Sequence, residues 1–190
     1  MTKIKFIVRC VNLRERMPFV DYLRKNLPDA TYLYHNGESG NENAMENFLE
    51  AMEISSDIPC LHLEDDIILT GDFENKVLTE IRNRKNNVIQ FFSMRSADVT
   101  VGSRWDNKFS MNQCFYLPPG YSKMILEYYR MWDKKEVHRS GYDILINDFL
   151  KSRHEKHWIC VPSLVQHRVA KSIINPKRSS KRQSLSFSPK

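Results

Sequence analysis

The chain has 190 residues, 41% of them hydrophobic and 11% aromatic, which is enough for one ordinary domain with its own core. Seven of its 29 basic residues lie between Arg168 and Lys190, where no acidic residue occurs, so residues 1–167 hold 22 basic and 23 acidic residues. The formal charge of +6 therefore belongs to the C-terminal segment, which excludes a uniformly basic nucleic-acid coat.

Strand and helix patterns alternate along residues 1–167. The strands show as runs rich in Ile, Val and Phe, and the helices as apolar residues at i, i+3, i+4 and i+7. In chain order the pattern predicts strand 4–11, helix 17–27, strand 30–34, helix 45–52, strand 59–63, helix 74–84, strand 88–92, strand 112–117, helix 121–129, helix 142–150 and strand 158–161. We expect an α/β fold with a mixed, mainly parallel sheet flanked by helices, as a single domain over 1–167 followed by a basic segment over 168–190.

The cysteines and the start of the chain favour a reducing compartment. Cys10, Cys60, Cys114 and Cys160 lie in or beside apolar segments and form no Cys-x-x-Cys pair, so buried reduced thiols are favoured over disulfides or a zinc site. The first residues lack the apolar stretch of a signal peptide, and no run of roughly 18 apolar residues exists to span a membrane. We therefore expect a cytoplasmic protein.

Three consecutive acids, Glu64, Asp65 and Asp66, follow the strand over 59–63 and precede Ile67-Ile68-Leu69. Carboxylates at the end of a core strand repel one another and lose hydration, and a divalent cation is the simplest compensation. Hard oxygen ligands suit Mg²⁺ or Mn²⁺. Strand alternation would place Glu64 and Asp66 on one face and Asp65 on the other. The alternative is an exposed acidic turn without a ligand.

This order of elements, with Leu61-His62-Leu63-Glu64-Asp65-Asp66 about one third along the chain, resembles the GT-A-type glycosyltransferases and their Asp-x-Asp motif. The Glu-Asp-Asp form is similar to that of some lipopolysaccharide-processing and phage enzymes. The resemblance implies a GT-A-like, Rossmann-like fold and transfer of a hexose or pentose from a nucleotide-diphosphate sugar to a hydroxyl. It implies Asp66 as the primary ligand of Mn²⁺ or Mg²⁺, with Glu64 as a further metal candidate and Asp65 or Glu64 contacting ribose or metal-bound water.

The segment over 161–167 looks like the late element that, in many GT-A enzymes, returns a histidine to the metal. His167 is therefore the candidate third ligand, and a structural histidine is the alternative. His62 lies within a strand and is expected in the core. His154 and His157 flank a charged loop and are expected to face solvent.

Basic side chains near both ends of the chain are candidates for the nucleotide. From the C-terminal segment these are Lys171, Lys177, Arg178, Lys181 and Arg182, which can close over a diphosphate through charge-assisted hydrogen bonds. A solvated tail is the alternative. After the first strand they are Arg9, Arg14 and Arg16, where open α/β sheets bind ligands, although a place on the helix surface is the simpler interpretation.

An inverting transfer needs a carboxylate that deprotonates the acceptor hydroxyl. Asp143, in the first turn of the helix after Gly141, is the candidate base, with Asp148 behind it. The alternative is that Asp143 only stabilises the helix dipole. A retaining enzyme would need no such base, and the sequence leaves the two stereochemical courses open.

The acceptor is the open part of the function. The short chain and its basic segment favour double-stranded DNA as the acceptor. The resemblance to phage enzymes implies a hydroxymethylated pyrimidine, which has to be flipped out to react, and a place in the host cytoplasm if the chain is phage-encoded. A lipopolysaccharide or capsule hydroxyl is the alternative acceptor. A metal-dependent nuclease or phosphotransferase, or a non-catalytic nucleic-acid-binding domain, are the competing functions.

Overall fold

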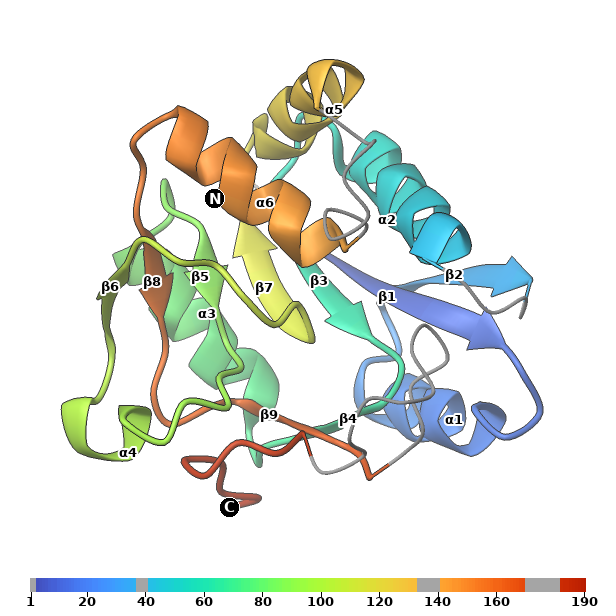
Figure 1. Cartoon of the computed structure of the whole chain (residues 1–190). Helices are drawn as coiled ribbons and strands as arrows, with labels where there is room; N and C mark the ends of the chain where they lie inside the picture. The colour runs from blue at the N-terminus through green and yellow to red at the C-terminus, as the bar shows by residue number, and fades with distance from the viewer. Residues whose placement is uncertain (1–2, 37–40, 133–140, 170–181) are drawn as a thin grey trace.

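The structure is a computed structural model that describes residues 3–36, 41–132, 141–169 and 182–190. Within these residues the chain forms a seven-stranded sheet in the order β2-β1-β3-β7-β5-β8-β6, and a separate two-stranded sheet of β4 and β9 (Figure 1). The strands are β1 (Lys5–Asn12), β2 (Thr31–Asn36), β3 (Cys60–Glu64), β4 (Ile67–Leu69), β5 (Ile89–Gln90), β6 (Arg104–Asp106), β7 (Cys114–Leu117), β8 (His157–Ile159) and β9 (Val165–His167).

Five of the seven strands described in the main sheet point the same way. β1 is parallel to β2 and β3, and β5 is parallel to β8. β7 lies between β3 and β5 and runs antiparallel to both, and the edge strand β6 runs antiparallel to β8. The sheet is therefore mixed and mainly parallel, which confirms the predicted fold class.

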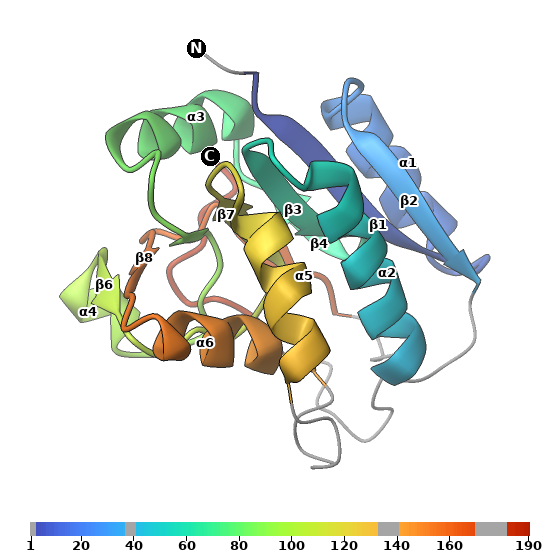
Figure 2. The same cartoon turned by 90° about the horizontal axis from the view of Figure 1, so that it is seen from above.

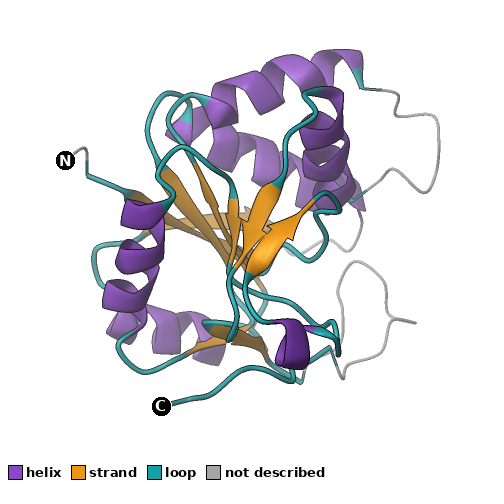
Figure 3. Ribbon diagram, turned by 90° about the vertical axis from the view of Figure 1, so that its left-hand side faces the viewer, coloured by secondary structure: helices purple, strands orange, loops and turns teal. Residues whose placement is uncertain are grey.

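Helices cover both faces of the main sheet, as Figure 3 shows. The helices are α1 (Met17–Asn26), α2 (Asn41–Ser55), α3 (Phe73–Asn83), α4 (Asp98–Val101), α5 (Tyr121–Met131) and α6 (Tyr142–Ser152). α1 and α3 pack on one face, and α2, α5 and α6 on the other. In Figure 2, α2 and α5 lie side by side over the sheet, and α6 contacts both.

Alternation along the strands assigns side chains to the two faces. On β1, Val8 and Cys10 join the core under α1 and α3, whereas Ile7 packs under α2. Arg9 shares the face of Ile7 and lies among aromatic rings of α2 and α6. Successive residues of a strand thus face opposite sides of the sheet. Arg9, near the end of β1, therefore lies only on the side of α2 and α6.

Four short elements are absent from the sequence prediction: β4, α4, β6 and β9. Residues 98–101 form α4 and residues 104–106 form β6, where a polar stretch without strand pattern is found in the sequence. β6 lies at the edge of the sheet, so only β8 pairs with it and its charged side chains keep access to solvent. Asp106 forms an ion pair with Arg95. An edge strand held by ion pairs has no apolar alternation for a sequence pattern to detect.

Two histidines of the main sheet, His62 and His157, are fully buried. His62 is fully buried and stacks on Phe115 with ring centroids 5.0 Å apart, as predicted. The prediction for His157 was wrong, because this residue is fully buried on β8, with its ring 5.2 Å from that of Phe109. Burial lowers the pKa of His157 to about 4 despite the nearby Asp106 carboxylate. His154 is exposed, as expected.

All four cysteines are free and buried, which confirms the interpretation as reduced thiols. Burial raises the pKa of Cys10 above its usual range and that of Cys160 to about 12, so neither is a reactive thiolate. Among the described helices, none is long and apolar enough to cross a membrane.

The two-stranded sheet of β4 and β9 lies on the side of α1 and holds the end of the chain (Figure 1). The Ser184 hydroxyl donates to Ser163 Oγ at 2.8 Å, and the Thr70 hydroxyl donates to the carbonyl of Ser188 at 2.7 Å. The Gly71 N–H donates to the carbonyl of Pro189 at 3.1 Å. Residues 182–190, the described end of the predicted basic segment, therefore pack against the body of the protein.

Candidate functional site

The three acids lie where the chain leaves one sheet and enters the other. β3 ends at Glu64, Asp65 and Asp66 form a bend, and Ile67 begins β4 in the second sheet. The predicted alternation of the acids was therefore wrong, because the strand does not continue through them. Asp65 and Asp66 turn to the same side, that of α1, and only Glu64 faces the layer of α2 and α6.

Arg16, at the start of α1, compensates the two aspartates. Its Nη1 lies 3.1 Å from Asp65 Oδ1 and 2.7 Å from Asp66 Oδ2, and all three side chains are buried. The backbone N–H of Val11, near the end of β1, donates to Asp65 Oδ2 at 2.9 Å. The carboxyl ends of β1 and β3 and the start of α1 thus meet at one buried ion cluster.

The charged side chains of this cluster shift one another's pKa values. Burial raises the pKa of Asp65 to about 7, the charge of Asp66 adds to the rise, and Arg16 opposes it. Burial acts on Asp66 in the same direction, but His167 and Arg16 hold its pKa below the ordinary value. The pKa of Arg16 is raised because Asp66 and Asp65 together outweigh burial, which alone would lower it. Asp66 is therefore the member of the pair that holds its negative charge more firmly.

His167 and Arg182 extend the cluster toward the end of the chain. His167 is fully buried on β9, and its Nε2 lies 3.3 Å from Asp66 Oδ2 and 2.7 Å from Arg182 Nη2. The N–H of Arg168 donates to the Asp66 carbonyl at 2.8 Å. We define the acidic cluster as Arg16, Asp65, Asp66, His167 and Arg182. His167, the candidate third ligand, thus lies beside Asp66, and Arg182, a candidate nucleotide contact, lies beside His167; both of these roles stay predictions.

The acidic cluster does not fit a divalent cation in this arrangement. A magnesium or manganese ion needs several oxygen ligands, and Asp66 Oδ1 is the one described carboxylate oxygen of this cluster that is buried without a hydrogen-bond partner. His167 Nδ1 and Arg182 Nε are also buried there without a partner among the described residues. Both Asp66 Oδ2 and Asp65 Oδ1 contact Arg16, which supplies the positive charge. In the described ranges no three His, Cys, Asp or Glu side chains converge as a metal site requires. Metal ligation by Asp66, Glu64 and His167 stays a prediction.

Glu64 belongs to a different set of contacts. The Tyr142 hydroxyl, in the first turn of α6, donates to Glu64 Oε1 across 78 residues of sequence. Asp143 follows directly, is half-buried and acts electrostatically on Tyr142. Asp143 Oδ1 accepts the N–H of its neighbour Ile144 at 3.1 Å. The candidate base therefore follows a residue that contacts Glu64, and its role as the base stays a prediction.

Arg9 lies in the same layer as Glu64 and is its direct neighbour in the pairing of β1 with β3. Its side chain is buried, and its Cζ lies 4.5 Å from the ring centroid of Tyr142. Arg14, the other N-terminal candidate, is exposed on the loop before α1. We define the arginine cluster as Arg9, Glu64 and Tyr142. Lys177 and Arg178, like Lys171 and Lys181, fall outside the described residues.

The sequence did not reveal two of these roles. Arg16 was one of three candidate arginines, without any sign that it pairs with the acids 49 residues later. Tyr142 fits the apolar stripe of its helix, and nothing local shows that its hydroxyl reaches Glu64. The only usable signal was the need of buried carboxylates for a cation, which an arginine meets as well as a metal does.

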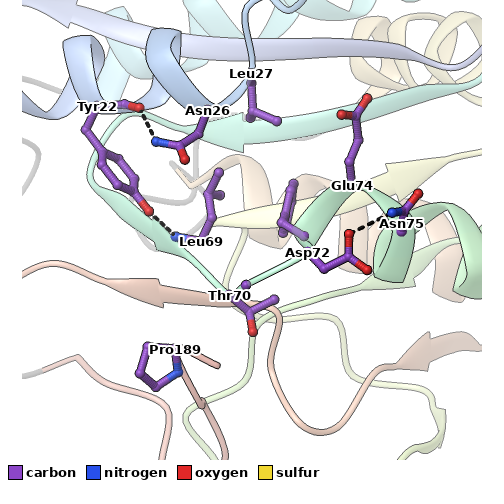
Figure 4. A pocket seen from close by; sticks show the side chains of 11 residues that line it. Tyr22, Asn26, Leu27, Leu69, Thr70, Asp72, Glu74, Asn75 and Pro189 are labelled. Atoms are coloured by element: carbon purple, nitrogen blue, oxygen red, sulfur yellow. Dashed lines mark hydrogen bonds between the residues drawn. The ribbon is translucent and has the colours of Figure 1, made fainter.

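A separate polar hollow of about 400 Å³ lies between α1, the end of β4 and α3 (Figure 4). Several of its polar atoms bond to one another: the Leu69 N–H donates to Tyr22 Oη at 3.1 Å, and Asn75 donates to Asp72 Oδ1 at 2.6 Å. Pro189 closes one side. This hollow contains none of the residues predicted for the site.

Comparisons with known proteins give only distant similarity. No family model matches the sequence, and no curated protein matches it. Among solved structures, A197 from STIV shares 16% identity with a TM-score of 0.49, covering 92% of each chain. A putative glucose-1-phosphate thymidylyltransferase from Bacillus anthracis, in complex with a sucrose, shares 10% identity with a TM-score of 0.49, covering 87% of this chain and 89% of that one. A UDP-glucose pyrophosphorylase complexed with UDP-glucose shares 11% identity with a TM-score of 0.43, covering 83% of this chain and 72% of that one. At such values we take neither an activity nor a residue's role from these proteins.

Proposed function

We propose that this protein is a glycosyltransferase that moves a sugar from a nucleotide-diphosphate donor to a hydroxyl acceptor. The observation that carries the proposal is the hydrogen bond from Tyr142 to Glu64, because the candidate base Asp143 is the residue next to Tyr142. The site lies at the carboxyl ends of parallel strands, where open α/β sheets bind their ligands. Carboxylates lie on both sides of the sheet at these strand ends. In the proposal they would accept the proton of the acceptor hydroxyl and hydrogen bonds from the donor sugar.

In the proposed reaction Asp143 takes the proton of the acceptor hydroxyl, whose oxygen then attacks the anomeric carbon of the donor sugar. The bond from that carbon to the diphosphate breaks, and the nucleoside diphosphate leaves with the electron pair. Basic side chains of the segment 168–190 are the proposed contacts for the diphosphate, with Arg182 at its described end. A bound Mn²⁺ or Mg²⁺ would have to displace Arg16 from the acidic cluster, and we assign it no step.

The acceptor proposed first is the hydroxymethyl group of a modified pyrimidine in double-stranded DNA. Its support is the charge of the segment 168–190, whose seven basic residues and no acidic one suit a phosphate backbone. A lipopolysaccharide hydroxyl is the second acceptor, since the same segment suits an anionic lipid surface. The two acceptors predict different products from the same enzyme.

Thermal shift with nucleotide sugars tests donor binding. We expect one UDP or GDP sugar to raise the unfolding temperature, corresponding to about 2.7 kcal/mol at a hundred times its Kd. A CMP sugar, which lacks the diphosphate, is the contrast. Each donor is measured with and without Mn²⁺, so that a metal requirement shows as a difference between the arms. No shift with any donor in either arm would overturn the proposal.

Transfer is then measured by mass spectrometry on hydroxymethylated DNA and on lipopolysaccharide. Asp143→Asn should retain the donor-induced thermal shift and lose transfer by a factor of about 10² to 10⁴. Asp148→Asn is the matched control, because Asp148 lies on the same helix and accepts from Trp132 Nε1 at 3.2 Å. Equal transfer by Asp143→Asn and the control would exclude Asp143 as the base.

A further inference from the structure

The guanidinium of Arg9 is buried with most of its donors unused. Only 6% of the residue is exposed, and its one hydrogen bond among the described residues runs from Nη2 to the Asn112 carbonyl at 3.2 Å. Nε and Nη1 are buried and have no partner there. A buried polar group is normally hydrogen-bonded, so two idle donors on a charged side chain call for a physical reason.

The neighbouring carboxylate does not supply that reason. Glu64 stands beside Arg9 in the register of β1 and β3, yet its Oε1 accepts from Tyr142 instead. In the part of the chain that the structure describes, Arg9 makes no ion pair with a carboxylate. The Glu64 carboxylate thus lies next to Arg9 but hydrogen-bonds to Tyr142.

Aromatic rings surround the same guanidinium. Its Cζ lies 4.5 Å from the ring centroid of Tyr142, 5.6 Å from that of Phe48 and 5.7 Å from that of Phe115. Ring faces attract a cation without using its N–H donors, and they exclude water from it. The rings thus hold the guanidinium in place while Nε and Nη1 stay available for an oxygen anion.

We propose that Arg9 binds an anionic group, a phosphate or a carboxylate, of a ligand that enters at the carboxyl ends of β1 and β3 on the side of α2 and α6. A guanidinium in a dry site suits both groups, because charge-assisted hydrogen bonds are strong there. This anion site lies on the opposite side of the sheet from Asp65 and Asp66. It goes beyond the proposed transfer reaction, since a protein without that activity would bind the anion equally well.

The test compares Arg9→Met with Arg82→Met, which removes an exposed arginine from the last turn of α3. Inorganic pyrophosphate is the probe, added at constant ionic strength, and unfolding midpoints report its binding. We expect Arg9→Met to unfold at or above the wild-type midpoint without pyrophosphate, because an unpaired buried charge has been removed. Its pyrophosphate affinity should fall about tenfold or more. Arg82→Met should bind as the wild type does.

A lower midpoint together with unchanged pyrophosphate affinity in Arg9→Met would make Arg9 structural and overturn the proposal. If this variant does not fold, the Nε–H resonance of Arg9 in the wild-type protein, assigned by its absence from Arg9→Lys, gives the answer. A saturable shift with pyrophosphate and none with sodium chloride supports the site. An unmoved resonance, with pyrophosphate and glucuronate alike, overturns it.

Glucuronate and glucose separate the two sources of the anion. A shift with pyrophosphate alone assigns Arg9 to a phosphate, and a shift with glucuronate but not glucose assigns it to a sugar carboxylate. Equal shifts with glucuronate and glucose would mean that Arg9 recognises neutral hydroxyl groups, and the anion site would be wrong.

Discussion

The acidic cluster and the arginine cluster lie on opposite sides of the same sheet edge and differ in how their charges are met. In the acidic cluster, Asp65 and Asp66 share the guanidinium of Arg16, and His167 and Arg182 add further contacts. In the arginine cluster, two nitrogens of Arg9 have no partner among the described residues. Glu64 belongs to the arginine cluster and the next residue, Asp65, to the acidic cluster, so consecutive residues contribute to the two sides of the sheet.

This difference indicates that the acidic cluster stabilises the fold and that the arginine cluster binds a ligand. A buried ion cluster with its charges paired is destabilised strongly when one member is removed, whereas an unpaired buried charge costs stability while it is present. Proteins accept such a cost mainly where function requires it. We therefore expect stability to depend on Arg16, and ligand binding to depend on Arg9.

Arg16→Met is the variant with the largest expected effect. It leaves two buried carboxylates without their cation, so the free energy of unfolding in urea should fall by about 3–5 kcal/mol. Arg14→Met, at an exposed position, should change it by less than about 0.5 kcal/mol. A loss below about 1 kcal/mol for Arg16→Met would show that the pair does not rely on this guanidinium.

The pH dependence of stability tests another buried titratable group, His157. Its pKa of about 4 lies below the ordinary 6.5, so the unfolded chain binds the extra proton between these values. Stability from this residue is complete above pH 6.5 and is lost as the pH falls toward 4, by on the order of 3 kcal/mol. The described groups facing His157 are Asp106, Arg95, Arg104 and the ring of Phe109.

Urea unfolding between pH 4 and 7 measures this effect. His157→Phe should flatten the curve in that window, and His154→Gln, at an exposed position, should leave it as in the wild type. His62 is buried as well, and burial lowers its pKa in the same sense. A curve unchanged by His157→Phe would assign the pH dependence to other groups.

Arg182→Gln should have a smaller effect. The change removes the contact between Arg182 Nη2 and His167 Nε2, and Arg182 is half-buried, so we expect a loss of about 1 kcal/mol in the free energy of unfolding. Hydrogen exchange should show the loss locally, at the amides of β9 that pair with β4. Protection lost equally at β1 and β3 would instead indicate that the whole acidic cluster had opened.

Tyr142→Phe is the mildest change and the sharpest test of the comparison. It removes the hydroxyl that holds Glu64, whose side chain is half-buried and can be rehydrated, so the loss of stability should be roughly 0.5 kcal/mol. The freed carboxylate can then pair with Arg9. We expect pyrophosphate affinity to fall several-fold in titration calorimetry, and an unchanged affinity would show that Glu64 does not compete for this site.

The main elements of the fold could be predicted because their burial leaves a local pattern. β1, α1, α5 and α6 lie within a few residues of the ranges that apolar periodicity indicates. The order of strands could not be predicted, since β3 pairs with β7 and β5 with β8 across long stretches of sequence. β6 escaped prediction because an edge strand bearing ion pairs has no apolar face to reveal it.

The candidate site was predictable only in its acids. Glu64, Asp65 and Asp66 stand out because consecutive carboxylates between apolar strands need compensation. The residues that meet this need, Arg16 and Tyr142, are distant in sequence and have ordinary neighbours. The sequence shows which side chains need a partner, but only the fold determines which side chain contacts them.

The pairing of β4 with β9 has a consequence for the order in which this chain matures. Ile67 pairs with His167, so during synthesis the three acids emerge long before the strand that covers them. Until then their mutual repulsion keeps the segment hydrated and works against premature pairing of the apolar strands on either side. Among the described strands this pair is the most distant in sequence, so we expect its closure to be a late step of folding.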